Sequence, residues 1–438
     1  MSSPLTMDVV VIGAGAAGLS AAADLAQNGL RVTALEARDR LGGRILTRRS
    51  PSQELPIELG AEFVHGRPHE IWEIVESAHL KTHEVGGEPW CRRDGRLEQC
   101  PELRRRVERL LGRMTAKRRD RSFQEFLESD AAAEPPEIKL RATAFVEGFN
   151  AAHADRVSVQ WLVDSRHADE AIAGDHSYRL LDGYGELVAQ LAKRLEHGAC
   201  DLRLNTTVRA IRWRRGSVSV VTGGGEIFKA RRAVVTLPLA VLRVPVSAGG
   251  VAFDPDIKAK RDAFAKIAVG DVVRVVLVFR ERFWEHLQPS GRSLERLSFL
   301  FSNDECFPTW WTTMPARSTI FTGWSAGRRA ERLRDKDATW IAARAVSSLS
   351  DILGMEHSVL RATLDRAYYH DWYADPFSRG AYSYVLVGGA DAPSELAAPL
   401  DATLFFAGEA TDTTGHNGTV HGAIASGKRA AREILAAS

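Results

Sequence analysis

A short apolar run followed at once by a glycine-rich loop constrains this chain more than any other feature. Residues 9–12 are continuously apolar, as expected for a parallel strand covered on both faces. The loop Gly-Ala-Gly-Ala-Ala-Gly follows at 13–18, and residues 15–28 form an Ala- and Leu-rich stretch that predicts a helix closed by Gly29. Residues 30–35 predict a second strand that ends at Glu36. The pattern indicates a βαβ unit and therefore an α/β fold.

The three glycines of this loop have separate roles in binding a dinucleotide. Gly13 allows the tight turn out of the strand, Gly15 lets the backbone approach a pyrophosphate, and Gly18 lets the helix pack closely on the strand. The helix directs its amide hydrogens and its positive dipole end at the phosphates. Glu36 has the spacing at which a carboxylate accepts hydrogen bonds from the adenosine ribose. We therefore predict a dinucleotide site at this unit.

The length of the chain, 438 residues, favours two domains over a single core. Strand-like runs recur far along the chain, at 232–238 and 403–408, so we predict a discontinuous nucleotide domain. Its predicted segments are 1–85, 181–245 and 386–438. The predicted substrate domain comprises a helical, charged insertion at 86–180 and an aromatic-rich insertion at 246–385, which contains a long strand candidate at 272–279. This arrangement predicts a pocket at the domain interface.

Composition and charge argue against several other classes of function. The formal net charge of +2 indicates no particular partner, and the hydrophobic and charged fractions of 45% and 26% are those of a soluble globular protein. The basic residues at 104–121 are interleaved with Glu108 and Asp120 and with apolar residues at helical spacing. A solvated helix with one apolar face is therefore favoured over a nucleic-acid or membrane patch.

Targeting signals and cysteine spacing point to an ordinary intracellular enzyme. Neither a secretory signal peptide nor a membrane-spanning stretch is recognisable, so we expect a cytoplasmic protein. The four cysteines show no metal-ligand or redox spacing, which predicts reduced, unpaired thiols and no metal site. These cysteines are Cys91, Cys100, Cys200 and Cys306.

The segment Glu-Ala-Arg-Asp-Arg-Leu-Gly-Gly-Arg at 36–44 resembles the second flavin motif of the flavin-containing amine oxidase family. That family includes monoamine and polyamine oxidases, L-amino-acid oxidases and flavin histone demethylases, and the motifs are most similar to those of the polyamine oxidases. Further similar segments lie at 58–66, 181–185, 234–238, 372–384 and 406–427, in the family's order. The resemblance implies a glutathione-reductase-like FAD-binding domain with an interleaved α+β substrate domain.

The resemblance also implies which residues contact FAD. The motif positions are Gly43, Trp372 and Gly408, together with Glu36, Arg38, Arg44, Glu62, Phe63, Val208, Glu409, Thr419 and Val420. Arg44 can reach the phosphates as a bidentate donor, and Glu409 corresponds to a carboxylate near the ribityl chain. The segment 419–424 is expected to start a helix under the flavin, whose amide end stabilises the reduced anion. Ala381 stands where monoamine oxidases carry a cysteine bonded to FAD, so non-covalent binding is implied.

The family reaction removes a hydride from the carbon next to an amine nitrogen, after which the imine is hydrolysed and oxygen reoxidises the flavin to give hydrogen peroxide. The resemblance implies a polyamine or another alkyl amine as substrate. Tyr382 matches one of two aromatic residues that flank the amine, whereas the other position is Thr419. His416 and Trp372 are candidates for the missing aromatic wall. The alternative is that Tyr382 is simply a packed aromatic residue.

Two further residues are candidates for the reacting pocket. Arg274 occupies the position of a family lysine that holds a water near the flavin, and as a permanent cation it can orient water or stabilise reduced flavin but cannot act as a base. A cation among valines needs a partner unless it is an edge-strand residue reaching solvent. Lys266 is a weaker substitute. His65 resembles a substrate-channel histidine of polyamine oxidases, or else packs at a turn.

Two other functions remain open from the sequence. One is a related flavin desaturase or dehydrogenase that passes electrons to an acceptor other than oxygen. The other is a non-catalytic binding protein of the kind represented by the Rab GDP-dissociation inhibitors, which the intact glycine loop argues against. We expect a small amine and molecular oxygen as partners, no nucleic acid, no membrane, and a monomer or homodimer.

Overall fold

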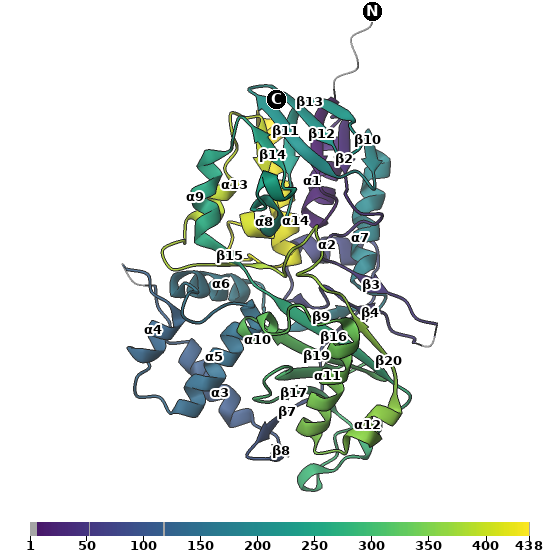
Figure 1. Cartoon of the computed structure of the whole chain (residues 1–438), viewed down its shortest axis with the longest axis vertical. Coiled ribbons are helices and arrows are strands. Elements are labelled where there is room, and N and C mark those ends of the chain that lie inside the picture. Colours follow the sequence, from purple (N-terminus) through teal and green to yellow (C-terminus); the bar gives the residue numbers. More distant parts are fainter. Residues whose placement is uncertain (1–6, 52, 117–118, 438) are drawn as a thin grey trace, which may run out of the picture.

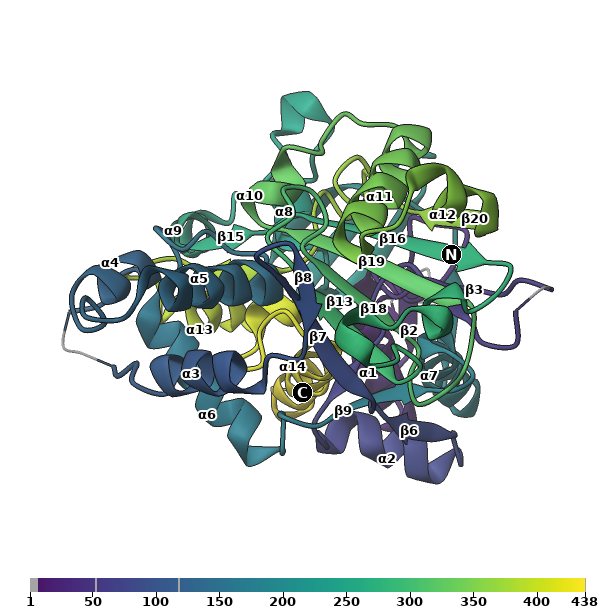
Figure 2. The same ribbon diagram turned by 90° about the horizontal axis from the view of Figure 1, so that it is seen from below.

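The computed structural model describes residues 7–51, 53–116 and 119–437. Two large sheets organise the chain, one in the upper half and one in the lower half of Figure 1. Helices α3 to α6 lie beside the lower sheet, and α11 and α12 lie across it, as the view from below shows (Figure 2). The two-domain α/β class predicted from the sequence is confirmed.

The first sheet contains a parallel core that is assembled from segments far apart in the sequence. Its parallel core runs in the order β10 (Cys200–Arg203), β2 (Val32–Leu35), β1 (Met7–Ile12), β13 (Ile227–Val235) and β22 (Leu404–Phe406). Strand β13 also pairs antiparallel with β12 (Ser217–Thr222), which continues to β11 (Val208–Arg214) and β14 (Ala252–Asp254). The predicted strands at 9–12, 30–35, 232–238 and 403–408 all belong to this core.

Helices α1 (Ala16–Gln27) and α14 (Val420–Ala436) pack against each other on this sheet. Their contact is close because small residues face each other, and a Cβ placed on Gly427 would lie 2.2 Å from the carbonyl oxygen of Ala17. Gly29, just beyond α1, has a φ of +83°, which is the helix-ending conformation expected of glycine. The predicted first βαβ unit is therefore confirmed.

The second sheet forms the floor of the other domain. Its strand order is β20 (Leu364–Tyr369), β16 (Val272–Phe279), β19 (Ile320–Ala326), β18 (Thr309–Thr312), β17 (Leu297–Phe301), β7 (Glu88–Arg93) and β8 (Arg96–Glu98). Every residue of β16 is buried, since β19 and β20 pair with it on either side. The strand predicted at 272–279 thus matches β16. Helix α11 (Ala338–Leu353) covers one face of the sheet.

The helical insertion predicted at 86–180 is only partly helical. Helices occupy α3 (Pro101–Leu111), α4 (Phe123–Glu128), α5 (Pro136–Asn150) and α6 (Val159–Ala171). Residues 88–98 instead extend the second sheet, because β7 pairs with the distant strand β17. On α3, Glu102 and Glu108 pair with neighbouring arginines while Val107 and Leu110 are buried, which confirms a solvated helix with an apolar face. Lys117 and Arg118, part of the same basic run, lie outside the described residues.

The remaining elements connect the two sheets. The helices are α2 (His69–Ser77), α7 (Tyr184–Lys193), α8 (Leu239–Leu242), α9 (Lys258–Lys266), α10 (Arg328–Glu331), α12 (His357–Thr363) and α13 (Ala392–Ala397). The strands are β3 (Thr47–Arg48), β4 (Ile57–Glu58), β5 (Val64–His65), β6 (Thr82–Glu84), β9 (Ser177–Leu180), β15 (Ile267–Val269) and β21 (Ser383–Val385). The sequence predicts that 246–385 belongs to the substrate domain, but β14, which lies within that range, pairs with β11 in the first sheet. The predicted domain boundaries stay a prediction. Among the described residues, no helix is both long and apolar enough to cross a membrane.

The prediction of four reduced thiols is wrong for one pair. Cys91 in β7 and Cys100 just before α3 form a disulfide, with Cα atoms 6.1 Å apart. The hairpin of β7 and β8 folds the nine-residue separation back on itself, so two cysteines without any motif spacing become neighbours. Cys200 and Cys306 are free and half-buried.

Candidate active site

The glycine loop leaves its backbone open on one side and tightly packed on the other. Gly13 has a φ of +104°, and a Cβ there would lie 2.6 Å from the hydroxyl of Thr236. A Cβ on Gly18 would lie 1.9 Å from the carbonyl oxygen of Gly13, so only glycine fits. Gly15 faces Gly43, and a Cβ on Gly15 would meet nothing nearer than 3.9 Å. The open side is a cradle of bare backbone at the start of α1, suited to a phosphate group.

Glu36 is held at the end of β2 by two backbone amides. Its carboxylate accepts hydrogen bonds from the amide of Ala14 at 2.8 Å and from the amide of Arg38 at 2.9 Å. The side chain is buried, which fixes one carboxylate beside the glycine loop. This is the orientation that ribose recognition requires, because each carboxylate oxygen keeps a further lone pair.

Arg38 joins the nucleotide loop to a segment more than 330 residues later. Its guanidinium donates to Asp375 and to the hydroxyl of Ser378, both at 2.8 Å, and lies over the ring of Phe377. Burial raises the pKa of Asp375, but hydrogen bonds from His370 and Arg38 outweigh it and hold that pKa well below its usual range. Sequence reasoning gave no role to Asp375 or Ser378, although both lie within the motif at 372–384.

Arg40 clamps the loop that contains the paired glycines. It donates to the carbonyls of Leu41 and Ile45 at 3.1 Å and to that of Gly43 at 3.0 Å. Three backbone acceptors for one guanidinium fix the turn that presents Gly43 opposite Gly15. Arg40 is a positioning residue that the sequence analysis did not identify.

Arg44 and Glu409 connect the two ends of the chain. Their side chains form an ion pair at 2.9 Å, and Arg44 also donates to the carbonyl of Ala381. The other oxygen of Glu409 accepts from the amide of Gly418 at 3.0 Å and from the side chain of Ser383. The buried carboxylate therefore organises four separate segments. Gly408, just before it, has a φ of +131° that suits glycine.

Thr419 caps helix α14, as predicted, and this occupies its side chain. Its hydroxyl accepts from the amide of Gly422 at 3.0 Å and donates to the carbonyl of His416 at 2.7 Å. Val420 is the first residue of the helix. The Tyr382 ring lies beside Gly418, where an added Cβ would be 3.3 Å from the ring. Tyr382 thus adjoins the start of α14.

The hydroxyl of Tyr382 is anchored across the site. It donates to the carbonyl of Phe149 at 2.7 Å, and burial together with the charge of Glu409 raises the pKa of this phenol. Phe149 in turn lies edge-on to His65, with ring centroids 5.4 Å apart. Tyr382 thus contacts the backbone of Phe149, and the ring of Phe149, which is exposed, contacts that of His65. Phe149 had no role in the sequence analysis.

His65 lies half-buried in strand β5. Its Nδ1 lies 3.2 Å from the hydroxyl of Ser177, and its ring centroid lies 6.1 Å from that of Phe63. Burial lowers its pKa, only partly opposed by the charge of Asp169. Phe63 also packs on Trp311 at 5.6 Å and under the guanidinium of Arg179. These rings form an aromatic cluster around Phe63.

Arg274 is buried in a central strand, so the alternative of an edge arginine reaching solvent is wrong. It forms an ion pair with Glu62 and donates to the carbonyl of Gly60 at 2.7 Å. The other oxygen of Glu62 accepts from Arg179 at 2.6 Å, and Trp311 donates to the carboxylate at 3.0 Å. Lys266, the weaker substitute, instead pairs with Glu395 at the end of α9.

This cluster has an excess of positive charge, because Arg274 and Arg179 both bind the carboxylate of Glu62. Burial raises the pKa of Glu62, but the charges of Arg274 and Arg179 outweigh it and leave that pKa below its ordinary value. The Nε atom of Arg274 is buried and makes no hydrogen bond with any described residue. A buried donor without a partner is costly unless a ligand or water satisfies it. The N–H group on Nε of Arg274 is therefore available to a bound molecule.

Trp372 and Val208 are two further residues predicted to contact the cofactor. The indole of Trp372 donates to the carbonyl of Leu59 at 2.8 Å and its ring contacts His370 at 4.2 Å. Val208 is buried in the core of the first sheet at the start of β11. The ring of His416 faces His421 at 4.5 Å. Among the described residues, ring contacts bring neither Trp372 nor His416 against Tyr382, and the second aromatic wall stays a prediction.

Comparisons with known proteins agree on one family. Residues 16–435 match the sequence profile described as flavin containing amine oxidoreductase. Polyamine oxidase 4 of Oryza sativa subsp. japonica is 29% identical over 97% of this chain and 88% of that protein. Polyamine oxidase 2 of Arabidopsis thaliana is 30% identical over 97% and 87%. Lysine-specific histone demethylase 2 of Homo sapiens is 26% identical over 98% of this chain, which spans 53% of that protein.

A solved structure gives the same answer for the fold. Wild-type putrescine oxidase bound to putrescine superimposes with a TM-score of 0.81 over 99% of both chains, at 21% sequence identity. At this identity the likeness concerns the fold alone, and it agrees with the two-domain arrangement of the sheets.

Proposed function

Because this chain belongs to the family of flavin-containing amine oxidoreductases, we propose that it binds FAD without a covalent link and oxidises a polyamine or another alkyl amine. One observation carries the proposal. The ion pair of Arg44 and Glu409 ties the glycine-loop side of the site to the start of α14 and to the backbone beside Tyr382. A dinucleotide site and an aromatic pocket are thereby joined in one place.

The described residues fit FAD. The open backbone at Gly15 and Gly43 suits a pyrophosphate, and Glu36 suits the adenosine ribose. Arg38 and Arg44 are placed near the same loop by their ion pairs with Asp375 and Glu409. We propose that the start of α14 at Thr419 and Val420 lies beneath the isoalloxazine, where the helix dipole favours negative charge.

When bound, FAD supplies the hydride acceptor for the carbon next to the amine nitrogen and returns the electrons to oxygen as hydrogen peroxide, while water hydrolyses the imine. The protein's part is to bind the amine, orient it and exclude water. We propose that Tyr382 and His65 lie beside the bound amine, where burial lowers an amine's pKa toward the neutral form that has a free lone pair. An unprotonated ring nitrogen of His65 can accept a hydrogen bond from a substrate nitrogen, and burial favours this form by lowering the pKa of His65.

We assign Arg274 to holding a water molecule or the substrate through its unpaired Nε atom. The test is the pair Arg274→Ala and Arg274→Lys, followed by stopped-flow measurement of flavin reduction and reoxidation. We expect Arg274→Ala to slow at least one half-reaction about tenfold or more, with partial rescue in Arg274→Lys. Normal rates for both half-reactions in Arg274→Ala would remove Arg274 from the reacting pocket.

The covalent state of the flavin has its own test. Ala381 carries no nucleophile at the position where a cysteine would bond to the cofactor. We expect acid precipitation to release all of the flavin into the supernatant, with the chromatographic mobility of FAD. Flavin that stays with the precipitate would contradict the assignment.

The substrate class is tested by anaerobic bleaching of the bound flavin with spermidine, putrescine, tyramine and amino acids. We expect polyamines or alkyl amines to bleach the flavin, and bleaching by amino acids alone would contradict the proposal. Steady release of hydrogen peroxide in air separates an oxidase from a desaturase or dehydrogenase with another acceptor. A colourless protein would revive a binding protein. Size-exclusion chromatography distinguishes a monomer from a homodimer, the two states we expect.

A further inference from the structure

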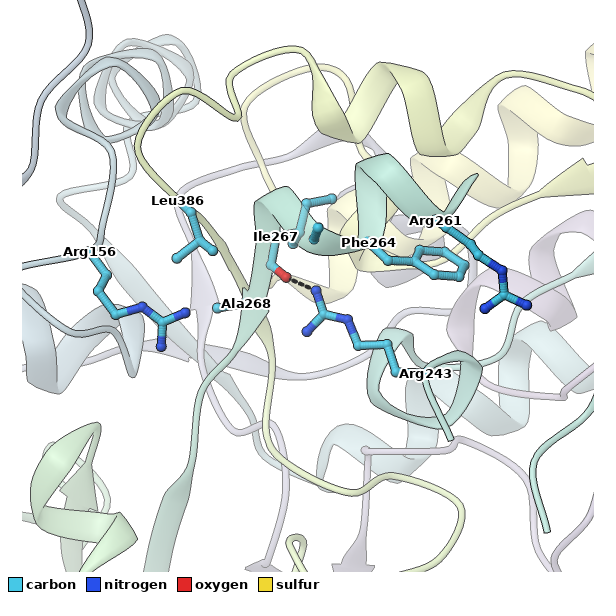
Figure 3. Close-up of a pocket in the computed structure, with 8 residues that line it drawn as sticks. Arg156, Arg243, Arg261, Phe264, Ile267, Ala268 and Leu386 are labelled. Carbon is cyan, nitrogen blue, oxygen red and sulfur yellow. Dashed lines mark hydrogen bonds between the residues drawn. The ribbon is translucent and has the colours of Figure 1, made fainter. Parts of the chain in front are cut away.

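A second cavity lies away from the candidate active site, at the junction of the helical layer with the first sheet. Its volume is about 360 Å³, within the range of small-molecule sites. Figure 3 shows Arg156 and Arg243 approaching from opposite sides of Ala268, with Arg261 beyond Phe264. None of these residues belongs to the group around Tyr382 or to the glycine loop.

Two of the three arginines in this cavity have no acidic partner in the part of the chain that the structure describes. Arg261 forms two hydrogen bonds with Asp256, at 3.0 and 2.6 Å. Arg243 donates to the carbonyl of Ile267, and no described residue offers Arg243 or Arg156 a carboxylate. Burial lowers the pKa of Arg243, and the charge of Arg156 lowers it further. Since a guanidinium stays protonated in proteins, the cavity holds two uncompensated positive charges at neutral pH.

The rest of the cavity wall is apolar. Phe264 and Ile267 are buried side chains of α9 and β15, and Leu386 is half-buried just after β21. The backbone around the cavity is well ordered by hydrogen bonds, because the amide of Leu386 donates to the carbonyl of Lys266 and that of Val387 to the carbonyl of Arg156, at 2.9 and 3.0 Å. A hydrocarbon surface beside two guanidinium groups that have no carboxylate partner among the described residues matches an amphipathic anion.

We propose that this cavity binds an organic anion, with its carboxylate between Arg156 and Arg243 and its hydrocarbon part against Phe264, Ile267 and Leu386. The two guanidinium forks supply paired donors for an oxyanion, and the anion relieves the repulsion between the two cations. The apolar wall distinguishes such a ligand from a bare inorganic anion. The inference does not depend on which amine the enzyme oxidises.

The proposal is tested by titrating the flavin-loaded protein with octanoate in a calorimeter. Octanol serves as the uncharged match and inorganic phosphate as the anion without a hydrocarbon part. We expect one octanoate to bind per chain, and octanol and phosphate to bind at least about tenfold more weakly. Phosphate binding as tight as that of octanoate would contradict the claim that the apolar wall binds the hydrocarbon part of the ligand. Absence of saturable octanoate binding would overturn the site.

Variants then locate the binding. Arg156→Gln removes an exposed cation that makes no side-chain hydrogen bond with a described residue, so folding is retained, and Arg212→Gln removes an exposed charge on β11 as a matched control. We expect about tenfold weaker octanoate binding in Arg156→Gln and Arg243→Gln, wild-type binding in Arg212→Gln, and partial recovery in Arg156→Lys. Flavin content and melting temperature check the fold of each variant. Undiminished binding in both glutamine variants would contradict the proposal.

Discussion

Arg274 and Glu62, 212 residues apart in the sequence, form an ion pair in which 5% and 8% of the two side chains are exposed. Arg179 binds the same carboxylate from the other side. One buried carboxylate therefore compensates two buried guanidinium groups, and Trp311 completes its hydrogen bonds. Among the described residues, Glu62 is the carboxylate that lies within ion-pair distance of both cations.

Glu62→Gln is expected to destabilise the protein by about 3–5 kcal/mol, because it leaves Arg274 and Arg179 buried without a counter-charge. Denaturant unfolding of the two proteins at neutral pH measures the difference. Glu281→Gln, which removes an exposed carboxylate, is the matched control and should stay within about 0.5 kcal/mol of wild type. Equal stability of Glu62→Gln and wild type would show that Arg274 and Arg179 do not need the negative charge of Glu62.

Gly18→Ala is expected to abolish flavin retention, since the new methyl group would lie 1.9 Å from the carbonyl oxygen of Gly13 and would push α1 away from the loop. The ratio of flavin to protein absorbance measures retention. Gly148→Ala places a methyl group on α5 with no neighbour within 4 Å, and it should keep full flavin and gain up to about 1 kcal/mol of stability. Normal flavin content in Gly18→Ala would contradict the role of close packing.

Glu58 makes the folded protein more stable at acidic pH than at neutral pH. Burial raises its pKa to about 7, against hydrogen bonds from Tyr184 and Thr47 that lower it. The unfolded chain releases this proton near pH 4.5, so the contribution is complete below pH 4.5 and is lost as pH rises to about 7. We expect Glu58→Gln to remove this falling slope, on the order of 3 kcal/mol, from unfolding curves recorded across that range. An unchanged slope would contradict it.

His421 acts in the opposite direction. Burial, with the charges of His416 and His65, lowers its pKa to about 3. His421 binds a proton near pH 6.5 in the unfolded chain but stays unprotonated in the folded protein until the pH approaches 3. Its contribution to folding stability is therefore complete above pH 6.5 and is lost as the pH falls toward 3. In His421→Leu the loss of stability between pH 6.5 and 5 should be smaller than in wild type. Parallel curves for the two proteins would count against a buried neutral imidazole.

The disulfide predicts the thiol count of the unreduced protein. A thiol reagent added to the denatured, unreduced chain should detect two thiols, Cys200 and Cys306, and four after reduction. Cys100→Ser should lower stability by about 2–3 kcal/mol, since the bond closes a loop of nine residues. Four thiols before reduction would mean that the pair is open in the purified protein.

The geometry of the glycine loop and of the start of α14 was predictable from the sequence because its requirements are local. Gly13 and Gly18 need a turn and a close helix contact within six residues, and Thr419 needs only the amide of Gly422. The need of Arg274 for a partner was also predictable, since a cation among buried valines is costly. Its partner was not, because Glu62 and Trp311 meet Arg274 only when distant segments come together.

The hairpin at 88–98 shows the same limit in the fold. Its sequence carries charged residues and a proline, and its strand character comes from pairing with β17, about 200 residues later. The neighbouring segment 101–111 has a helical pattern of its own and was recognised. Cys91 and Cys100 escaped detection for the same reason, since the hairpin and not their spacing brings them together.

The parallel core of the first sheet has a consequence for synthesis of the protein on the ribosome. Strand β13 receives its neighbour β22 from a segment about 170 residues further along the chain, and α1 receives α14 from one about 390 residues further along. Until then the apolar face of α1 and one edge of β13 are uncovered. The parallel core is therefore complete only once α14 has been synthesised, and before that point these surfaces are open to non-native association.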